Sequence, residues 1–323
     1  MVSIVPSLIQ VLIIAHPDDE SMFFLPWIYY TTMHRQRNND PSIPSAVWLL
    51  CLTTGNFDGL GEIRSKEVHD FNKYVLNDHS FQKVLIIDEP DIMPDHPNQR
   101  WNISLTAEQI YTKLHSTLNE EYGSNSQRPS TLSIVTFDQR GVSGHVNHID
   151  TYLAVQHLYQ QQLSLLQSSS TSSSSNQQQV RLASKALEVW VLQTIQNPII
   201  KYIPIVEWVR FLLHTTLNWY PKSDMHIDPT TCPTPSSWYR LLQPSLNWYA
   251  MSTHQSQFVW YRRLFVIFSI YTYRNTFHKL LPHHGSDGRN EEYVTISYTN
   301  MITRFPILEQ QRQGDDDRAK KEL

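Results

Sequence analysis

The chain has 323 residues, 40% of them hydrophobic and 17% charged, so it is long enough to bury one substantial core. The net charge is −4, and residues 1–180 hold more acidic than basic side chains, whereas residues 181–313 are mildly basic. This acidic first half, with no nucleic-acid-binding motif, argues against a nucleic-acid partner. Two cysteines exclude a disulfide framework, and in residues 1–10 we expect neither a secretory signal nor a membrane span.

Five apolar runs separated by helical patterns predict five strands. These strands cover residues 11–15, 46–53, 83–88, 132–137 and 185–192. Strands that alternate with helices are typical of a doubly wound, mostly parallel sheet. We therefore predict a single α/β domain over residues 1–323, Rossmann-like, with helices on both faces of the sheet. Ligands of such sheets bind outside the carboxyl ends of the strands.

The first strand ends in the most informative motif of the chain, AHPDDE at residues 15–20. His16, Asp18 and Asp19 supply an imidazole and two carboxylates, which can hold one divalent metal ion and leave one carboxylate free as a base. This set of groups is typical of a metal-dependent hydrolase. Glu20 comes just after the loop, where we expect a carboxylate at the start of a helix rather than a metal ligand.

The loop after the fourth strand, residues 141–148, adds two histidines. Its glycines permit a tight turn, and His145 and His148 both reach one pocket if a helix begins near His145. A zinc hydrolase needs three protein ligands, a position for water and a proton acceptor beside it. One such cluster alone is more often structural, but two at the carboxyl ends of separate strands favour a functional site.

Two segments of low complexity lie outside this pattern. Residues 160–179 are almost entirely Gln and Ser, and we predict a disordered insertion there. The last residues, 314–323, form a charged tail that includes Lys320 and Lys321. This pair resembles a retrieval signal for the endoplasmic reticulum, although two lysines in a polar tail are also explained by solvation alone.

Two segments of the second half suit a membrane surface. Residues 199–217 are apolar with charges between them, as in an interfacial amphipathic helix or, equally, a helix packed on the core. Residues 258–268 are aromatic, and core packing is the default for their apolar members. Arg262 and Arg263 stand beside Trp and Tyr there, which would also fit the headgroup region of a bilayer.

Several of these motifs resemble those of the LmbE-like de-N-acetylases. The resemblance covers roughly residues 11–277 and rests on residues 15–20, residues 53–61, Arg64, Glu67 and residues 141–148. Residues 137–145 and the late motif at residues 254–262 look most like the eukaryotic branch of the family, which acts on N-acetylglucosaminyl-phosphatidylinositol.

The resemblance implies a role for each site residue. The metal ligands of the family fall on His16, Asp19 and His148, and its general base falls on Asp18. Its second histidine falls on His145, and in protonated form this residue would stabilise the oxyanion or donate to the leaving amine. The metal is expected to be zinc, although two histidines and one carboxylate also suit iron or manganese.

Two further residues resemble the sugar contacts of the family. They are Arg64 and Asp95, with Asp91 as an alternative to Asp95. The implied reaction converts N-acetylglucosaminyl-phosphatidylinositol to glucosaminyl-phosphatidylinositol and acetate. It is the second step of glycosylphosphatidylinositol (GPI) anchor biosynthesis, expected on the cytosolic face of the endoplasmic reticulum membrane.

Two other functions remain open at this point. A soluble de-N-acetylase of the same fold would act on another N-acetylglucosaminide, and only a lipid substrate calls for an apolar surface in the second half of the chain. A non-catalytic protein that binds sugar lipids would not need a complete set of catalytic and metal-binding residues. The complete set of His16, Asp18, Asp19, His145 and His148 argues against that last function.

Overall fold

The computed structural model describes residues 6–29, 31, 45–76, 81–123, 128–168, 181–203, 205, 209, 244–281 and 293–297. In this part of the chain one seven-stranded sheet has the order β3-β2-β1-β4-β5-β6-β7. Its parallel part consists of β1 (Leu8–Ile14), β2 (Ser45–Cys51), β3 (Lys83–Ile86), β4 (Thr131–Phe137) and β5 (Ala186–Leu192). The predicted α/β class and the five predicted strands are therefore confirmed.

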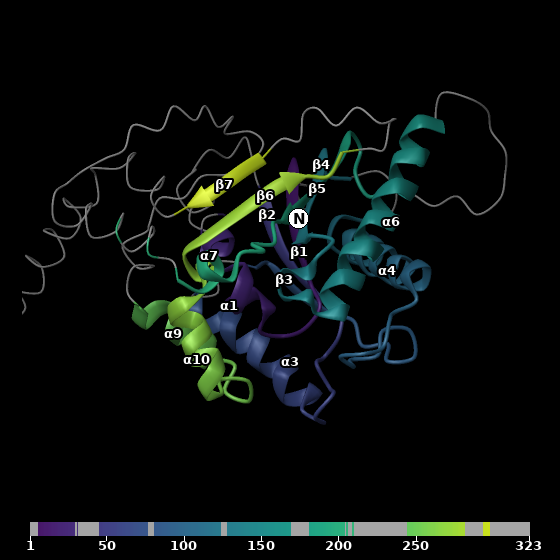
Figure 1. The fold of residues 1–323 in the computed structure, drawn as a ribbon. Helices are drawn as coiled ribbons and strands as arrows, with labels where there is room; N and C mark the ends of the chain where they lie inside the picture. Colours follow the sequence, from purple (N-terminus) through teal and green to yellow (C-terminus); the bar gives the residue numbers. More distant parts are fainter. Residues whose placement is uncertain are drawn as a thin grey trace, which may run out of the picture.

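The central strands are mostly apolar because helices cover both faces of the sheet. The crossover helices are α1 (Asp19–Phe23), α3 (Gly61–Asp70), α4 (Ile103–Tyr122) and α6 (Val146–Ser168), and the π-helix η1 (Phe71–Val75) continues α3. Figure 1 shows α4 and α6 side by side on one side of the sheet, with α1 and α3 on the other. The chain reverses its strand order at β1 and β4, so the carboxyl ends of these strands border the crevice where ligands bind.

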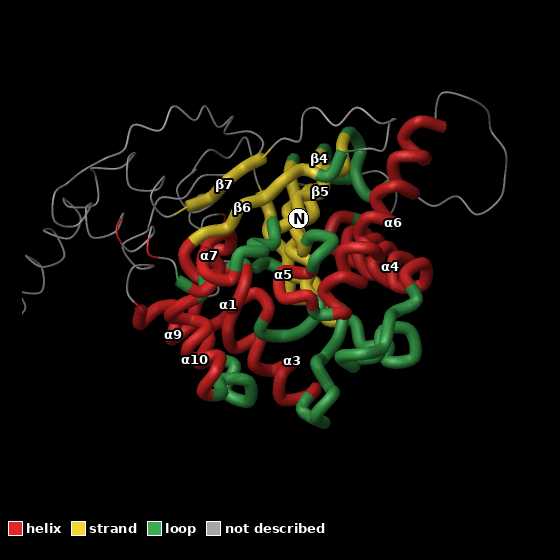
Figure 2. The backbone as a smooth tube through the Cα atoms, viewed as in Figure 1, coloured by secondary structure: helices red, strands yellow, loops and turns green. Residues whose placement is uncertain are grey.

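The second half of the chain extends the sheet and covers one side of it. The added elements are α7 (Pro198–Tyr202), α9 (Pro244–Ser252), α10 (Trp260–Phe268), α11 (Ile270–Tyr273), β6 (Arg274–Lys279) and β7 (Tyr293–Ser297). Both new strands are antiparallel. Asn275 on β6 fastens this half to the first, since its side chain donates to the carbonyl of Phe23 at 2.7 Å and accepts from the N–H of Trp27 at 3.1 Å. Figure 2 shows α9 and α10 near α1 and α3.

The helix α6 is longer than the sequence indicated. The prediction of a disordered insertion from residue 160 onward is wrong for residues 160–168, which continue the helix. Leu163 packs against the core, and Gln162 accepts a hydrogen bond from the N–H of Leu182 at 3.1 Å, so this last part of the helix has tertiary contacts. Residues 169–179 lie outside the described residues.

The predicted interfacial helix at residues 199–217 is described only at its start. Helix α7 spans Pro198–Tyr202, and its Ile199 and Ile200 are exposed. Residues 210–217 and the tail at residues 314–323 lie outside the described part of the chain. Among the helices that are described, none combines the length and the hydropathy needed to cross a bilayer.

Candidate active site

The first motif forms a tight loop between β1 and α1. The backbone N–H of His16 donates to Asp19 Oδ2 at 2.9 Å and closes this loop. Asp18 has φ 120° and ψ −20°, a conformation that residues other than glycine rarely adopt. Such strain persists only where surrounding contacts impose it, and it is concentrated at functional sites. The loop thus fixes three reactive side chains at the carboxyl end of the central strand.

The second motif is held just as firmly. Gly141 has φ +59°, and a Cβ atom added there would lie 2.8 Å from the Cβ of His148. Val142 has φ 59° and ψ −54°, which is strained for a β-branched residue. The N–H of Val142 donates to Thr194 Oγ1 at 2.9 Å, and its carbonyl accepts from Lys201 Nζ at 2.7 Å. These contacts set the path by which the chain enters α6 and so place His148.

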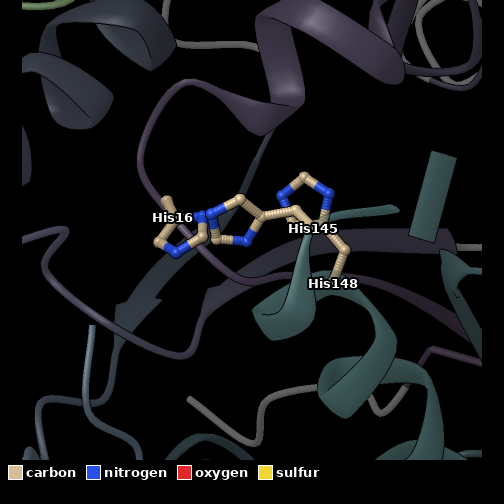
Figure 3. Close-up of side chains that lie close together, drawn as sticks. All are labelled: His16, His145 and His148. Atoms are coloured by element: carbon tan, nitrogen blue, oxygen red, sulfur yellow. The ribbon is translucent and has the colours of Figure 1, made fainter. Parts of the chain in front are cut away.

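The two loops bring three histidine side chains together. The ring centroid of His16 lies 5.1 Å from that of His145 and 5.5 Å from that of His148. One ring nitrogen of each residue lies within 4.8 Å of the other two. Figure 3 shows that His16 comes from the loop after β1, whereas the other two come from the segment that leads into α6. This cluster can bind a metal ion.

Asp19 joins the histidines through both of its carboxylate oxygens. Its Oδ1 lies 3.1 Å from His148 Nε2, and its Oδ2 lies 3.6 Å from His16 Nδ1. His148 Nδ1 lies 3.0 Å from the carbonyl oxygen of Gly141, which can only accept a hydrogen bond, so Nδ1 carries a proton and Nε2 is the nitrogen that faces Asp19. Two ligands of one zinc ion lie roughly 3.4 Å apart. Asp19 and His148 therefore have the spacing and the orientation of a ligand pair.

The charges of the cluster influence one another. Burial alone raises the pKa of Asp19, but His148 and His16 outweigh burial and hold that pKa well below its usual range. Burial and the nearby His16 and His148 lower the pKa of His145 to about 4. At neutral pH Asp19 is therefore ionised, as a metal ligand must be. His145 rests as a neutral imidazole rather than in the protonated form expected from the sequence.

Arg64, on α3, connects this loop to the loop after β2. Its guanidinium donates to the carbonyls of Gly55 at 3.0 Å and Pro17 at 2.9 Å, and its Nη2 lies 3.4 Å from Asp18 Oδ1. Gly55 has φ +71°, which favours glycine, and a Cβ atom there would lie 2.4 Å from the guanidinium carbon and displace that group. Arg64, predicted as a sugar contact, thus also orients the carboxylate of Asp18.

Asp95 is better placed for a bound sugar than its alternative Asp91. Its Oδ1 lies 3.1 Å from His16 Nε2, and its Oδ2 accepts from the N–H of Phe57 at 2.8 Å. His16, the N–H of Phe57 and Arg64 lower the pKa of Asp95 despite burial, which alone raises it. Asp91 is exposed and is not among the residues that line the pocket beside the histidines.

All seven predicted site residues line one pocket of about 790 Å³. They are His16, Asp18, Asp19, Arg64, Asp95, His145 and His148. Much of the remaining lining is apolar and comes from α7 and α10, and we call these residues the apolar wall: Tyr202, Tyr261, Leu264, Phe265 and Phe268. The pocket thus joins a polar cluster, suited to hydrolysis, to a wall suited to an apolar ligand.

The late motif is fastened to this site by two acidic residues whose partners the sequence did not indicate. His254 Nε2 and Glu20 Oε1 are in direct contact, and both side chains are fully buried. Ser256 donates from its backbone N–H to Glu67 Oε1 at 2.7 Å and from its hydroxyl to Glu67 Oε2 at 2.6 Å. Glu20 is therefore a structural residue beside the pocket, as its position at the start of α1 suggested.

Arg262 is a pocket residue that the sequence analysis did not include in the site. From the sequence, a bilayer headgroup region was one fit for Arg262 and Arg263, but Arg262 Nη1 donates to Asp18 Oδ2 inside the pocket. Arg263 instead donates to the carbonyl of Phe258 at 3.2 Å. The reason is the anchored turn at residues 254–259, which aims the pocket-lining face of α10 at the first motif.

Comparison with known proteins extends these findings. A family model described as PIG-L, GlcNAc-PI de-N-acetylase, matches residues 11–159. A protein of Dictyostelium discoideum named "Probable N-acetylglucosaminyl-phosphatidylinositol de-N-acetylase" is 30% identical over 270 residues, which are 82% of this chain and 90% of that protein. The N-acetylglucosaminyl-phosphatidylinositol de-N-acetylase of Saccharomyces cerevisiae is 26% identical over 82% of this chain and 79% of its own length. The protein of the same name from Bos taurus is 28% identical over 80% of this chain and 79% of its own length.

The matched region contains both loops that form the histidine cluster, together with Arg64 and Asp95. The similarity to the Dictyostelium protein continues well beyond that region. The chemistry of the pocket and the extent of these matches agree, and the chain belongs to the PIG-L family of de-N-acetylases.

Proposed function

We propose that this protein removes the acetyl group from N-acetylglucosaminyl-phosphatidylinositol and releases acetate and glucosaminyl-phosphatidylinositol. The observation that carries the proposal is one pocket with both a histidine-carboxylate cluster and an apolar wall. A glycolipid substrate needs both, since its amide must meet hydrolytic groups while its acyl chains leave water. The names of the relatives in Dictyostelium, yeast and cattle support the same substrate. The reaction would be the second step of GPI-anchor biosynthesis.

We assign a zinc ion to His16, Asp19 and His148. Two imidazoles and one carboxylate form a common ligand set of catalytic zinc, and the ionised Asp19 and the orientation of His148, with Nδ1 on a carbonyl and Nε2 toward Asp19, fit that set. A bound ion of this kind polarises a carbonyl and lowers the pKa of water. Iron or manganese would be accepted by the same donors.

Asp18 and His145 perform the proton chemistry in this proposal. Asp18 lies beside the ligand set without belonging to it, and as general base it accepts a proton from the attacking water. It then passes that proton to the amine nitrogen, as the new C–O bond replaces the C–N bond of the amide. His145, neutral at rest, donates its ring N–H to the developing oxyanion, as neutral imidazoles do in other enzymes.

Acetate release distinguishes the possible functions. We expect the purified protein to release acetate from N-acetylglucosaminyl-phosphatidylinositol much faster than from a soluble N-acetylglucosaminide, because only the glycolipid uses the apolar wall. Coupled detection of acetate, with mass spectrometry of the deacetylated lipid, measures both rates. Equal rates would favour a de-N-acetylase of soluble glucosaminides. Binding of the glycolipid without acetate release would indicate a non-catalytic sugar-lipid binder.

We further propose that the protein works on the cytosolic face of the endoplasmic reticulum membrane and rests on it by an apolar rim. The rim is the set of exposed apolar residues on α7 and α10: Ile199, Ile200, Tyr202, Trp260, Tyr261, Leu264 and Phe268. These two helices pack against each other. Four rim residues also line the pocket, so the same side chains face both the pocket and the solvent. This arrangement would let a lipid enter the pocket from the bilayer.

The rim predicts a membrane-binding defect. Trp260 is 71% and Leu264 48% exposed, so replacing both with serine removes apolar area that the folded protein does not need. At about 25 cal/mol per Å² of buried apolar area, we expect at least tenfold weaker binding to vesicles of phosphatidylcholine and phosphatidylinositol. Co-sedimentation measures it, and Leu105→Ser is the matched control because Leu105 is exposed on α4, on the other face of the sheet. Unchanged binding with a lowered melting temperature would contradict a membrane role for the rim.

A further inference from the structure

Arg262 occupies the boundary between the two parts of the pocket. It lies on α10 among residues of the apolar wall, since Tyr261, Leu264 and Phe265 line the pocket from the same helix. Its guanidinium nevertheless reaches the polar cluster and contacts Asp18. Burial lowers the pKa of Arg262 to about 10, which leaves the side chain charged at neutral pH.

The partners of Arg262 differ from those of the other arginine in the pocket. Arg64 uses its guanidinium on two backbone carbonyls and on Asp18. Arg262 donates from Nη1 to Asp18, and within the described residues its Nη2 and Nε make no hydrogen bond. A guanidinium has a planar fork of donors that matches a phosphate. Of the two, Arg262 therefore has donors to offer an anionic ligand.

The same contact restrains the proposed general base. The two carboxylate oxygens of Asp18 face different arginines, Oδ1 toward Arg64 and Oδ2 toward Arg262. Because Arg64 is fastened to the backbone of both loops, only the contact with Arg262 can be exchanged without dismantling the site. A carboxylate that is engaged on both oxygens is poorly placed to accept a proton from water.

We propose that Arg262 binds the phosphodiester of the substrate and in doing so releases Asp18 to act as the base. This inference rests on the proposed function, because it assumes a substrate with an acetylated sugar, a phosphodiester and acyl chains. With the sugar at the histidines and the acyl chains along the apolar wall, the anionic group falls at the boundary that Arg262 occupies. Arg262 thereby becomes the residue that selects a phosphate-bearing substrate over a neutral glucosaminide.

Two substrates test this selection. One is a short-chain N-acetylglucosaminyl-phosphatidylinositol, and the other is its neutral analogue, in which a carbonate ester replaces the phosphodiester and the same acyl chains are kept. For Arg262→Gln we expect kcat/KM to fall about 10- to 100-fold with the phosphate-bearing substrate, the usual effect of losing a charge-assisted hydrogen bond. With the phosphate-free substrate kcat/KM should stay constant or rise, because Asp18 is no longer engaged. Arg263→Gln is the matched control and should leave both values unchanged, since Arg263 is absent from the pocket lining.

The outcomes separate this inference from the proposed function. Equal losses with both substrates would mean that Arg262 only supports the fold, and the inference would be overturned. Absence of acetate release by the wild-type protein from either substrate would instead overturn the proposed function. If Arg262→Gln does not fold, Arg262→Lys carries the test, because it keeps the charge and loses the fork. The preference for the phosphate-bearing substrate must then shrink, and a preference equal to that of the wild type would refute the assignment.

Discussion

Metal content should fall from about one equivalent to background when any one of three residues is replaced. The variants are His16→Ala, Asp19→Asn and His148→Ala. A catalytic zinc ion with three protein ligands is not retained on two, because the lost donor is replaced only by water. Acetate release should be abolished in the same samples. Elemental analysis after gel filtration, beside a melting curve for each variant, provides the measurement.

His145→Ala is the decisive comparison within this series. The spacing of the ring nitrogens admits His145 as a third ligand, whereas our assignment gives that place to Asp19. We therefore expect His145→Ala to keep its metal and lose turnover, and Asp19→Asn to lose both. Metal retained by Asp19→Asn and lost by His145→Ala would assign the ion to the three histidines. Metal retained near one equivalent by all the variants would place the ion elsewhere.

Removal of the metal from the wild-type protein gives an independent check. Treatment with a chelator should abolish acetate release, and addition of zinc should restore it, whereas the fold should persist because the core of the sheet is apolar and separate from the site. Restoration by iron or manganese in place of zinc would change the identity of the metal but not the ligand set.

The parallel strands were predictable because buried strands appear in the sequence as short runs of apolar residues. β1 and β4 lie at the centre of the sheet, and strands covered on both faces consist mainly of apolar residues. β6 was not predicted, because Arg274–Lys279 is mostly polar and only Asn275 and Phe277 are buried in it. It joins the sheet by antiparallel pairing with β5 and is anchored by the buried amide of Asn275, whose contacts with Phe23 and Trp27 no local pattern indicates.

The site residues were predictable for a related reason. His16, Asp18 and Asp19 stand together in the chain, as do His145 and His148, so each cluster forms within one loop. Contacts between distant parts of the chain could not be predicted from the sequence.

The position of Arg262 is one of the features that the sequence did not predict. α10 follows a turn that is anchored by the contact between Glu20 and His254, which lie 234 positions apart in the chain. Local composition instead suggested a membrane-facing pair of arginines. Hydrophobic periodicity determines which elements form, but it does not determine which polar side chain is buried against a given carboxylate.

Asp18→Asn should retain the metal and lose turnover by roughly 10² to 10⁴, the contribution of a positioned general base. Asparagine is the appropriate replacement because it preserves the shape of the side chain and tolerates positive φ, which Asp18 adopts at 120°. An amide cannot accept the proton of the attacking water at neutral pH, so the loss should appear in kcat.

The same variant distinguishes a base from a group that only orients its neighbours. Substrate binding should change little in Asp18→Asn, because the carbonyl oxygen of the amide still accepts from Arg64 or Arg262. Metal content, kcat and KM measured on one sample therefore give three separate expectations: metal retained, kcat strongly reduced and KM nearly constant. A kcat close to that of the wild type would move the base to another residue. Loss of metal would show that Asp18 is itself a ligand, and the division of roles between the adjacent carboxylates of Asp18 and Asp19 would then be reversed.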